Sequence, residues 1–156
     1  MRIRLFNACG AFVFLFLLVC GLSACHKGDE DQMRETVDSF AEAYFNWQFQ
    51  KALPHVTPAS GRWLHYAASQ VTQEDIDSLR AMAEGAGCKI QSVDYSDADT
   101  LAVVTVAVSH FLAMDTIGRP SHLVDEAVCR LPVVFANDKW KVSLKALPRV
   151  RKTAAE

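Results

Sequence analysis

The hydrophobic pattern begins with a nearly unbroken apolar run close to the start of the chain. Two arginines precede it, residues 11–21 are almost wholly apolar, and the small residues of Leu22-Ser23-Ala24 lead directly to Cys25. A basic start, an apolar stretch and small residues before a cleavage site are typical of a secretory signal. An uncleaved anchor is the alternative, because residues 8–25 approach the about 18 residues that cross a bilayer. Either interpretation exports the rest of the chain.

Helical periodicity follows a polar segment at residues 25–32, which we expect to be a solvated tether. Apolar residues then recur at spacings of four and three, which predicts an amphipathic helix over about residues 32–49. Thr57 and Pro58 predict a second helix start, because threonine caps helices and proline is favoured at the first position. Thr72, followed three residues later by Asp75, predicts a third helix that begins in a capping box. The stripe of the first helix comprises Met33, Val37, Phe40, Ala41, Tyr44 and Trp47.

From Cys88 onward the period changes to two, which predicts four antiparallel strands connected as a meander. Pro132 falls inside the third strand, where we expect a bulge, because proline cannot donate to an inner ladder. Residues 148–156 are expected to form a flexible tail. One face of the second strand is predicted to carry Val104, Val106, Val108, His110 and Leu112.

Composition limits the size and the partners of the protein. Removal of residues 1–24 would leave one ordinary domain, over residues 33–147, that is large enough to bury a core. The chain has 16 basic and 18 acidic residues, and cleavage would remove two of the basic ones. No clustered basic face is evident, so we expect no nucleic-acid partner. An acidic domain gains little from anionic lipids, so acyl chains would have to hold it to the membrane.

The cysteines allow two interpretations. With Cys25 acylated, Cys88 and Cys129 remain as an even pair in an oxidising compartment, which favours a disulfide. The meander opposes that bond, because its first and third strands lie about 9–10 Å apart and a disulfide needs Cα atoms within about 7 Å. The alternative is two separate buried thiols.

The sequence Leu22-Ser23-Ala24-Cys25 resembles the lipobox of bacterial lipoproteins. In that family the thiol is diacylated and the signal is cut just before the cysteine. The resemblance implies a signal peptide at residues 1–24 and a protein held to a cell-envelope membrane by fatty acyl chains such as palmitate. The outer membrane is expected in preference to the inner, with the domain facing the periplasm or the surface.

Three helices followed by four strands is the element order of an α+β fold. The sequence resembles the NTF2-like superfamily and, within that superfamily, the small lipoproteins of diderm bacteria. The matching residues are the segment 47–53, the Thr57-Pro58 pair that begins the second helix, and the segments 99–103 and 138–142 that begin two of the strands. The resemblance implies a cone in which three N-terminal helices pack on a curved four-stranded meander. None of the matching residues is a catalytic motif.

Such a cone can hold a small molecule between the sheet and the first helix. Some relatives are isomerases or dehydratases that use a buried Asp or His base with a Tyr donor. Tyr44 and His110 are candidates for these roles, with Asp94 if its strand turns it inward. The alternative is a core histidine and a tyrosine that wedges against the core.

Aromatic residues supply a second candidate site. Trp47, Trp63 and Tyr66 form an aromatic-rich group around the helix ends, which suits an apolar ligand or a protein partner. Ordinary core packing is the alternative, because helical spacing alone explains Trp47. The five histidines share no metal-ligand spacing and no Cys-x-x-Cys occurs, so no metal or cofactor is expected.

These observations lead to one hypothesis and two alternatives. The hypothesis is a lipid-anchored, non-catalytic NTF2-like module that binds a small apolar ligand or an envelope protein through Tyr44, Trp47, Trp63, Tyr66 and His110. The alternatives are an enzyme of the ketosteroid-isomerase or dehydratase kind and a structural assembly subunit.

The lipobox interpretation predicts the effect of Cys25→Ser. The variant should be released from the membrane or mis-sorted, because the acyl chains would provide nearly all of its membrane affinity. Fractionation of membranes, with the size of the chain read on a gel, measures this. A variant that stays wholly membrane-bound and uncleaved would show that the segment is a transmembrane helix.

Overall fold

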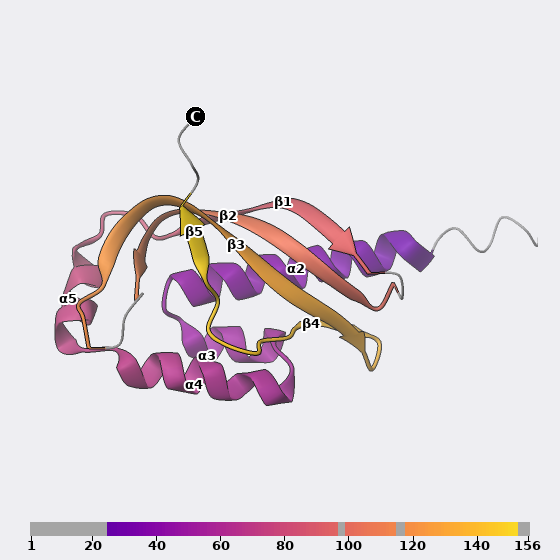
Figure 1. Ribbon diagram of the computed structural model, residues 1–156, viewed down its shortest axis with the longest axis horizontal. Coiled ribbons are helices and arrows are strands. Elements are labelled where there is room, and N and C mark those ends of the chain that lie inside the picture. Colours follow the sequence, from indigo (N-terminus) through magenta and orange to yellow (C-terminus); the bar gives the residue numbers. More distant parts are fainter. Residues whose placement is uncertain (1–24, 97–98, 115–117, 153–156) are drawn as a thin grey trace, which may run out of the picture. The chain divides into compact units, whose positions relative to one another are not determined.

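The computed structural model describes residues 25–96, 99–114 and 118–152 (Figure 1). The chain divides into two compact units, Met1–Asp31 and Gln32–Glu156. The predicted signal peptide, residues 1–24, lies outside the described residues. No helix in the described part of the chain combines the length and the apolar character that crossing a membrane requires.

The helices differ from the prediction mainly at the ends of the first one. Helix α2 spans Cys25–Phe45, so it begins in the segment that we expected to be a tether and ends before residue 49. Thr57 and Pro58 open the 3-10 turn η2, Pro58–Ser60, which leads into α4. The predicted capping box of α5 is confirmed, since Thr72 and Asp75 bond each other reciprocally. The remaining helical elements are α3 Phe49–Ala52, η1 Leu53–His55, α4 Gly61–Gln70 and α5 Gln73–Ala81.

The sheet has the predicted antiparallel meander and one strand more. Its order is β1-β2-β3-β4, and β5 pairs with β3 beside β4. The added strand lies within residues 148–156, the segment that we expected to be a flexible tail. The strands are β1 Gly87–Tyr95, β2 Leu101–Ala113, β3 His122–Ala136, β4 Lys139–Val142 and β5 Val150–Lys152.

The irregularity expected at Pro132 occurs elsewhere. The register of β2 with β3 is continuous through Pro132, whereas β1 shifts register between Ile90 and Ser92. The Pro132 carbonyl accepts from Ser143 N at 2.8 Å. In an antiparallel strand the N and O of one residue face the same neighbour, so the missing N–H of Pro132 faces away from β2. Neither β4 nor β5 pairs with Pro132 there, so the ladder loses no bond.

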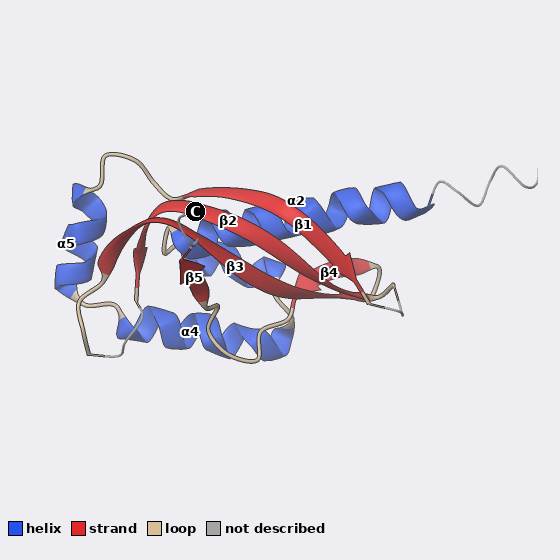
Figure 2. Cartoon of the chain, turned by 45° about the horizontal axis from the view of Figure 1, so that its top comes forward, coloured by secondary structure: helices blue, strands red, loops and turns tan. Residues whose placement is uncertain are grey.

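The core lies between the helices and the concave face of the sheet, and Figures 1 and 2 show the helices of this unit on that one side. This arrangement confirms the predicted α+β class. Among the described residues, every member of the hydrophobic core belongs to the unit Gln32–Glu156. Its largest fully buried side chains include Phe40, Phe111, Met33, Leu64, Leu131, Val37, Val104, Val106 and Val108.

One side chain ties the end of α2 to the start of β1. Asn46 Oδ1 accepts from Ala86 N at 2.8 Å, and Asn46 Nδ2 donates to the Glu42 carbonyl at 2.9 Å. The amide lies so close to Gly85 that a Cβ added there would be 2.5 Å from Oδ1. Gly85 is therefore required by the close approach of Asn46.

Gly85→Ala should lower the free energy of unfolding by about 1–2 kcal/mol, because the methyl group would displace an amide that is fixed by hydrogen bonds. Urea unfolding of the wild type and the variant measures this. In an Asn46→Ala background the same substitution should cost much less, because the clash is then gone. Equal costs in the two backgrounds would contradict the contact.

Candidate functional site

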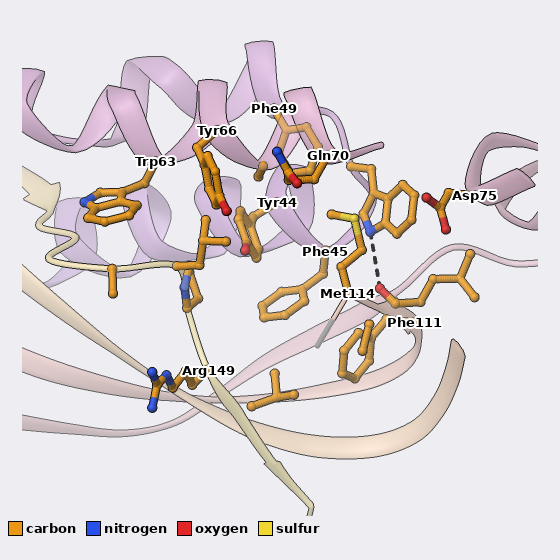
Figure 3. A pocket seen from close by; sticks show the side chains of 18 of the residues that line it. Tyr44, Phe45, Phe49, Trp63, Tyr66, Gln70, Asp75, Phe111, Met114 and Arg149 are labelled. Carbon is orange, nitrogen blue, oxygen red and sulfur yellow. Dashed lines mark hydrogen bonds between the residues drawn. The ribbon is translucent and has the colours of Figure 1, made fainter. Parts of the chain in front are cut away.

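An aromatic cavity of about 510 Å³ opens between the helices and the end of the sheet that holds residues 111–113 of β2 (Figure 3). A volume of this size is within the range of small-molecule sites. Helices α2, α3 and α4 supply one wall, and β2 with the segment around residues 146–150 supplies the other. Seven aromatic side chains line it: Tyr44, Phe45, Trp47, Phe49, Trp63, Tyr66 and Phe111.

The helical wall depends on an abrupt end of α2. Trp47 has φ 58°, a left-handed conformation that is rare for a bulky residue. Gln48 N donates to the Ala43 carbonyl at 2.8 Å, which closes the turn. The Trp47 indole Nε1 then donates to the Leu112 carbonyl at 3.2 Å, so the ring spans from the helix end to β2.

The opposite wall depends on a kink in β2. Val104, Val106 and Val108 are fully buried, as the alternation predicts. His110 then has φ 53°, and the next residue, Phe111, is 1 % exposed and lines the cavity. The left-handed residue interrupts the alternation, so the side chain that faces the core is that of Phe111 and not that of His110. His110, which we expected on the inner face, is therefore not among the lining residues.

The structure brings four of the five predicted ligand residues together. Tyr44, Trp47, Trp63 and Tyr66 line the cavity, and Figure 3 shows Tyr66, Tyr44 and Phe45 between Trp63 and Phe111. Ring contacts support this series, with centroid distances of 6.5 Å for Trp63–Tyr66, 5.2 Å for Tyr44–Phe45 and 5.2 Å for Phe45–Phe111. Asp94 pairs with Val103 on the outer face of the sheet, so it faces away from the cavity.

Three aromatic residues of the cavity were missed from the sequence. Phe45 and Phe49 point into the cavity only because α2 stops between them, and Phe111 does so only because of the His110 kink. The run of aromatic residues from Tyr44 to Phe49 was a usable signal, since so many rings at one helix end exceed a single helical stripe.

Uncharged polar groups line the cavity together with the charged side chains of Asp75, Arg119 and Arg149. Burial, with a smaller effect of Cys129, raises the pKa of Tyr44 well above its usual range, so its hydroxyl stays protonated. This hydroxyl makes no hydrogen bond within the described residues. The Tyr66 hydroxyl and the Gln70 amide also face the cavity (Figure 3). An uncharged ligand group with a free lone pair therefore has donors available.

Asp75 is the carboxylate that lines the cavity among the described residues, and its oxygens are occupied. Oδ1 accepts from Ser121 N at 2.9 Å, and Oδ2 accepts from Thr72 N at 2.9 Å and from Thr72 Oγ1 at 2.7 Å. Burial raises the pKa of this carboxyl, but these hydrogen bonds outweigh it and lower the pKa to about 2. Asp75 joins α5 to the segment that precedes β3 and is a poor general base.

Cys88 and Cys129 are free thiols. Cys88 pairs with Val108 and Cys129 with Val106, so they flank β2 and are also offset along it by two residues. Their Cα atoms are thus farther apart than two strand spacings, about 9–10 Å. Burial is the main cause that raises both pKa values to about 12, so neither forms a thiolate at neutral pH. Among the described side chains, no group of three or more His, Cys, Asp or Glu could hold a metal ion.

Comparisons with known proteins add little to this geometry. No family model matches the sequence, and no curated protein matches it either. A solved structure described as an "Ntf2 like protein involved in plasmid conjugation" is similar, with a TM-score of 0.38 and 18 % sequence identity. The likeness covers 78 % of this chain and 48 % of that one, so this chain spans about half of its length. It says nothing of what this chain binds.

The Asp75 contacts predict a pH-dependent contribution to stability. Folding lowers the pKa from 3.8 to about 2, so the stabilisation is present above about pH 4 and is lost as the pH falls toward 2. Asp75→Asn should reduce the free energy of unfolding at pH 7 by about 1–2 kcal/mol, and by less at pH 3. Urea unfolding at both pH values measures this, with Asp77→Asn on the same helix as the control. A loss that is independent of pH would contradict it.

Proposed function

We propose that this protein is a lipid-anchored component of a bacterial cell envelope whose aromatic cavity binds a small apolar ligand. The anchoring rests on the apolar run and on Leu22-Ser23-Ala24-Cys25. The ligand-binding role rests on one observation, a cavity of about 510 Å³ lined by aromatic side chains and by the unpartnered hydroxyl of Tyr44.

The aromatic walls favour a largely apolar ligand. Aromatic rings supply large apolar surfaces that exclude water, and the charged residues that line the cavity, Asp75, Arg119 and Arg149, are of both signs. Tyr44 is protonated and partly buried, so it would donate to a carbonyl or ether oxygen of the ligand. Such an oxygen would give the hydroxyl the hydrogen-bond partner that it lacks among the described residues.

Isomerase or dehydratase activity has less support. Such chemistry needs a base in the cavity whose pKa lies near neutrality. Asp75 is held ionised by three hydrogen bonds, and His110 and Asp94 lie elsewhere. The cavity with its free hydroxyl favours ligand binding over a purely structural role, which would need no such space.

Filling the cavity tests the binding proposal. The probe is Nile red, an uncharged fused-ring dye with a carbonyl oxygen, added to residues 25–156 carrying Cys25→Ser. Saturable fluorescence enhancement at one site per chain is expected. Ala67 is 1 % exposed and lines the cavity, so Ala67→Phe should weaken binding at least about tenfold, which corresponds to about 1.4 kcal/mol.

Ala68→Phe is the matched control, because Ala68 is exposed on the same helix and does not line the cavity. It should leave the affinity for Nile red unchanged. Circular dichroism melting curves of both variants separate loss of the site from loss of the fold. Equal affinity in the Ala67→Phe variant, or no saturable binding by the parent chain, would refute the proposal.

A further inference from the structure

Charge is unevenly distributed over the elements that form the cavity. Residues 43–73, which hold the end of α2 and helices α3 and α4, contain no Asp or Glu. Residues 139–152, which hold β4, β5 and the segment between them, contain none either. Of the 16 basic residues of the chain, these two segments carry Lys51, Arg62, Lys139, Lys141, Lys145, Arg149, Arg151 and Lys152.

The fold packs these two segments against each other. Thr57 N donates to the Val142 carbonyl at 3.0 Å, and Leu144 N donates to Ser60 Oγ at 2.8 Å. Both segments line the cavity, the first mainly through aromatic side chains and the second through residues 146–150. The walls that they supply therefore carry positive charge and no negative charge.

Three cations lie toward the Trp63 end of the cavity. Arg149 lines the cavity and is exposed, and Figure 3 shows it toward the same end as Trp63. The Arg62 guanidinium carbon lies 5.1 Å from the centroid of the Trp63 ring. Lys145 directly follows the residue that is bonded to the start of α4, and both Arg62 and Lys145 are exposed. These three residues, here named the basic rim, have no ion-pair partner within the described residues.

The opposite end of the cavity has a different charge. Figure 3 shows Asp75 and Arg149 at opposite ends. Arg119 lines the cavity two residues before Ser121, whose N–H donates to Asp75, so this end carries one charge of each sign. A negative group is therefore attracted to the basic rim more than to the Asp75 end. It is also excluded from the space between the aromatic rings, because burial of an unpaired charge is strongly unfavourable.

We propose that the ligand of the cavity is an amphiphile with one apolar chain and an anionic head group, a carboxylate or a phosphate. This inference rests on the binding function proposed above and adds the charge and the orientation of the ligand. The chain lies along the aromatic walls, and the head group stays at the solvent edge, where it pairs with the basic rim. Arginine presents its N–H donors in a planar fork that matches the oxygens of both head groups.

Calorimetric titration with three ligands of one chain length tests the head group. Decanoate, decyl phosphate and decanol are added, below micellar concentrations, to residues 25–156 carrying Cys25→Ser, the chain used with Nile red. At least one of the two anions should bind about tenfold more tightly than decanol, because the rim adds several partly exposed ion pairs. The tighter anion identifies the head group. If neither anion binds more tightly than decanol, the inference is wrong, whereas saturable binding of Nile red would still support the proposed function.

Charge reversal at Arg149 locates the head group. Arg149→Glu should remove the preference for the anion, leave the affinities for decanol and Nile red unchanged, and bind decylammonium more tightly than the parent chain does. The unchanged affinities show that the variant has folded.

Arg151→Glu is the matched control, because it changes the net charge of the chain equally. Arg151 pairs with Val128 on the outer face of the sheet and does not line the cavity. Exposed charges act over only about 8 Å at physiological ionic strength, so this variant should keep most of the preference. An equal loss in the two variants would show a general attraction of the domain for anions and would overturn the proposal.

Discussion

The hydrogen bond from the Trp47 indole to the Leu112 carbonyl is the contact on which the cavity depends. It joins Trp47, which follows the end of α2, to the part of β2 beyond the kink at His110. Trp47 and His110 both have left-handed backbone conformations. Each such residue costs about 1–2 kcal/mol relative to regular backbone. Burial of Phe111 and of the rings around Tyr44 offsets that cost, so the irregular backbone and the aromatic walls stabilise each other.

The regular parts of the fold could be predicted because their signals are local. The capping box of Thr72 and Asp75 and the alternation from Val104 to Val108 involve residues close in sequence, and the structure confirms both. The start of α2, the strand β5 and the position of the sheet irregularity could not be predicted in this way. Val150 is held by pairing with Cys129, a contact across twenty-one positions that leaves no periodic trace in a three-residue strand.

The site was predictable in its residue types more than in its geometry. Aromatic residues at helical spacing become buried in almost any packing, which is why Tyr44 and Trp47 were found. The role given to His110 assumed that alternation continues along the whole strand, and one positive φ angle ends it. Whether aromatic rings fill a space or only line it depends on the packing of several elements, and no short pattern encodes that volume.

The register shift at Gln91 gives β1 a further property. Lys89 and Asp94 are five positions apart in the sequence, so on a strand of this length without the register shift they would occupy opposite faces. The shift places both on the outer face while Ile90 and Val93 both pack on the core. A relative that lacks only the residue at position 91 would keep Lys89, Ser92 and Asp94 on one face and Ile90 and Val93 on the other, because regular alternation would then hold. The register shift therefore absorbs one inserted residue without turning either half of the strand over.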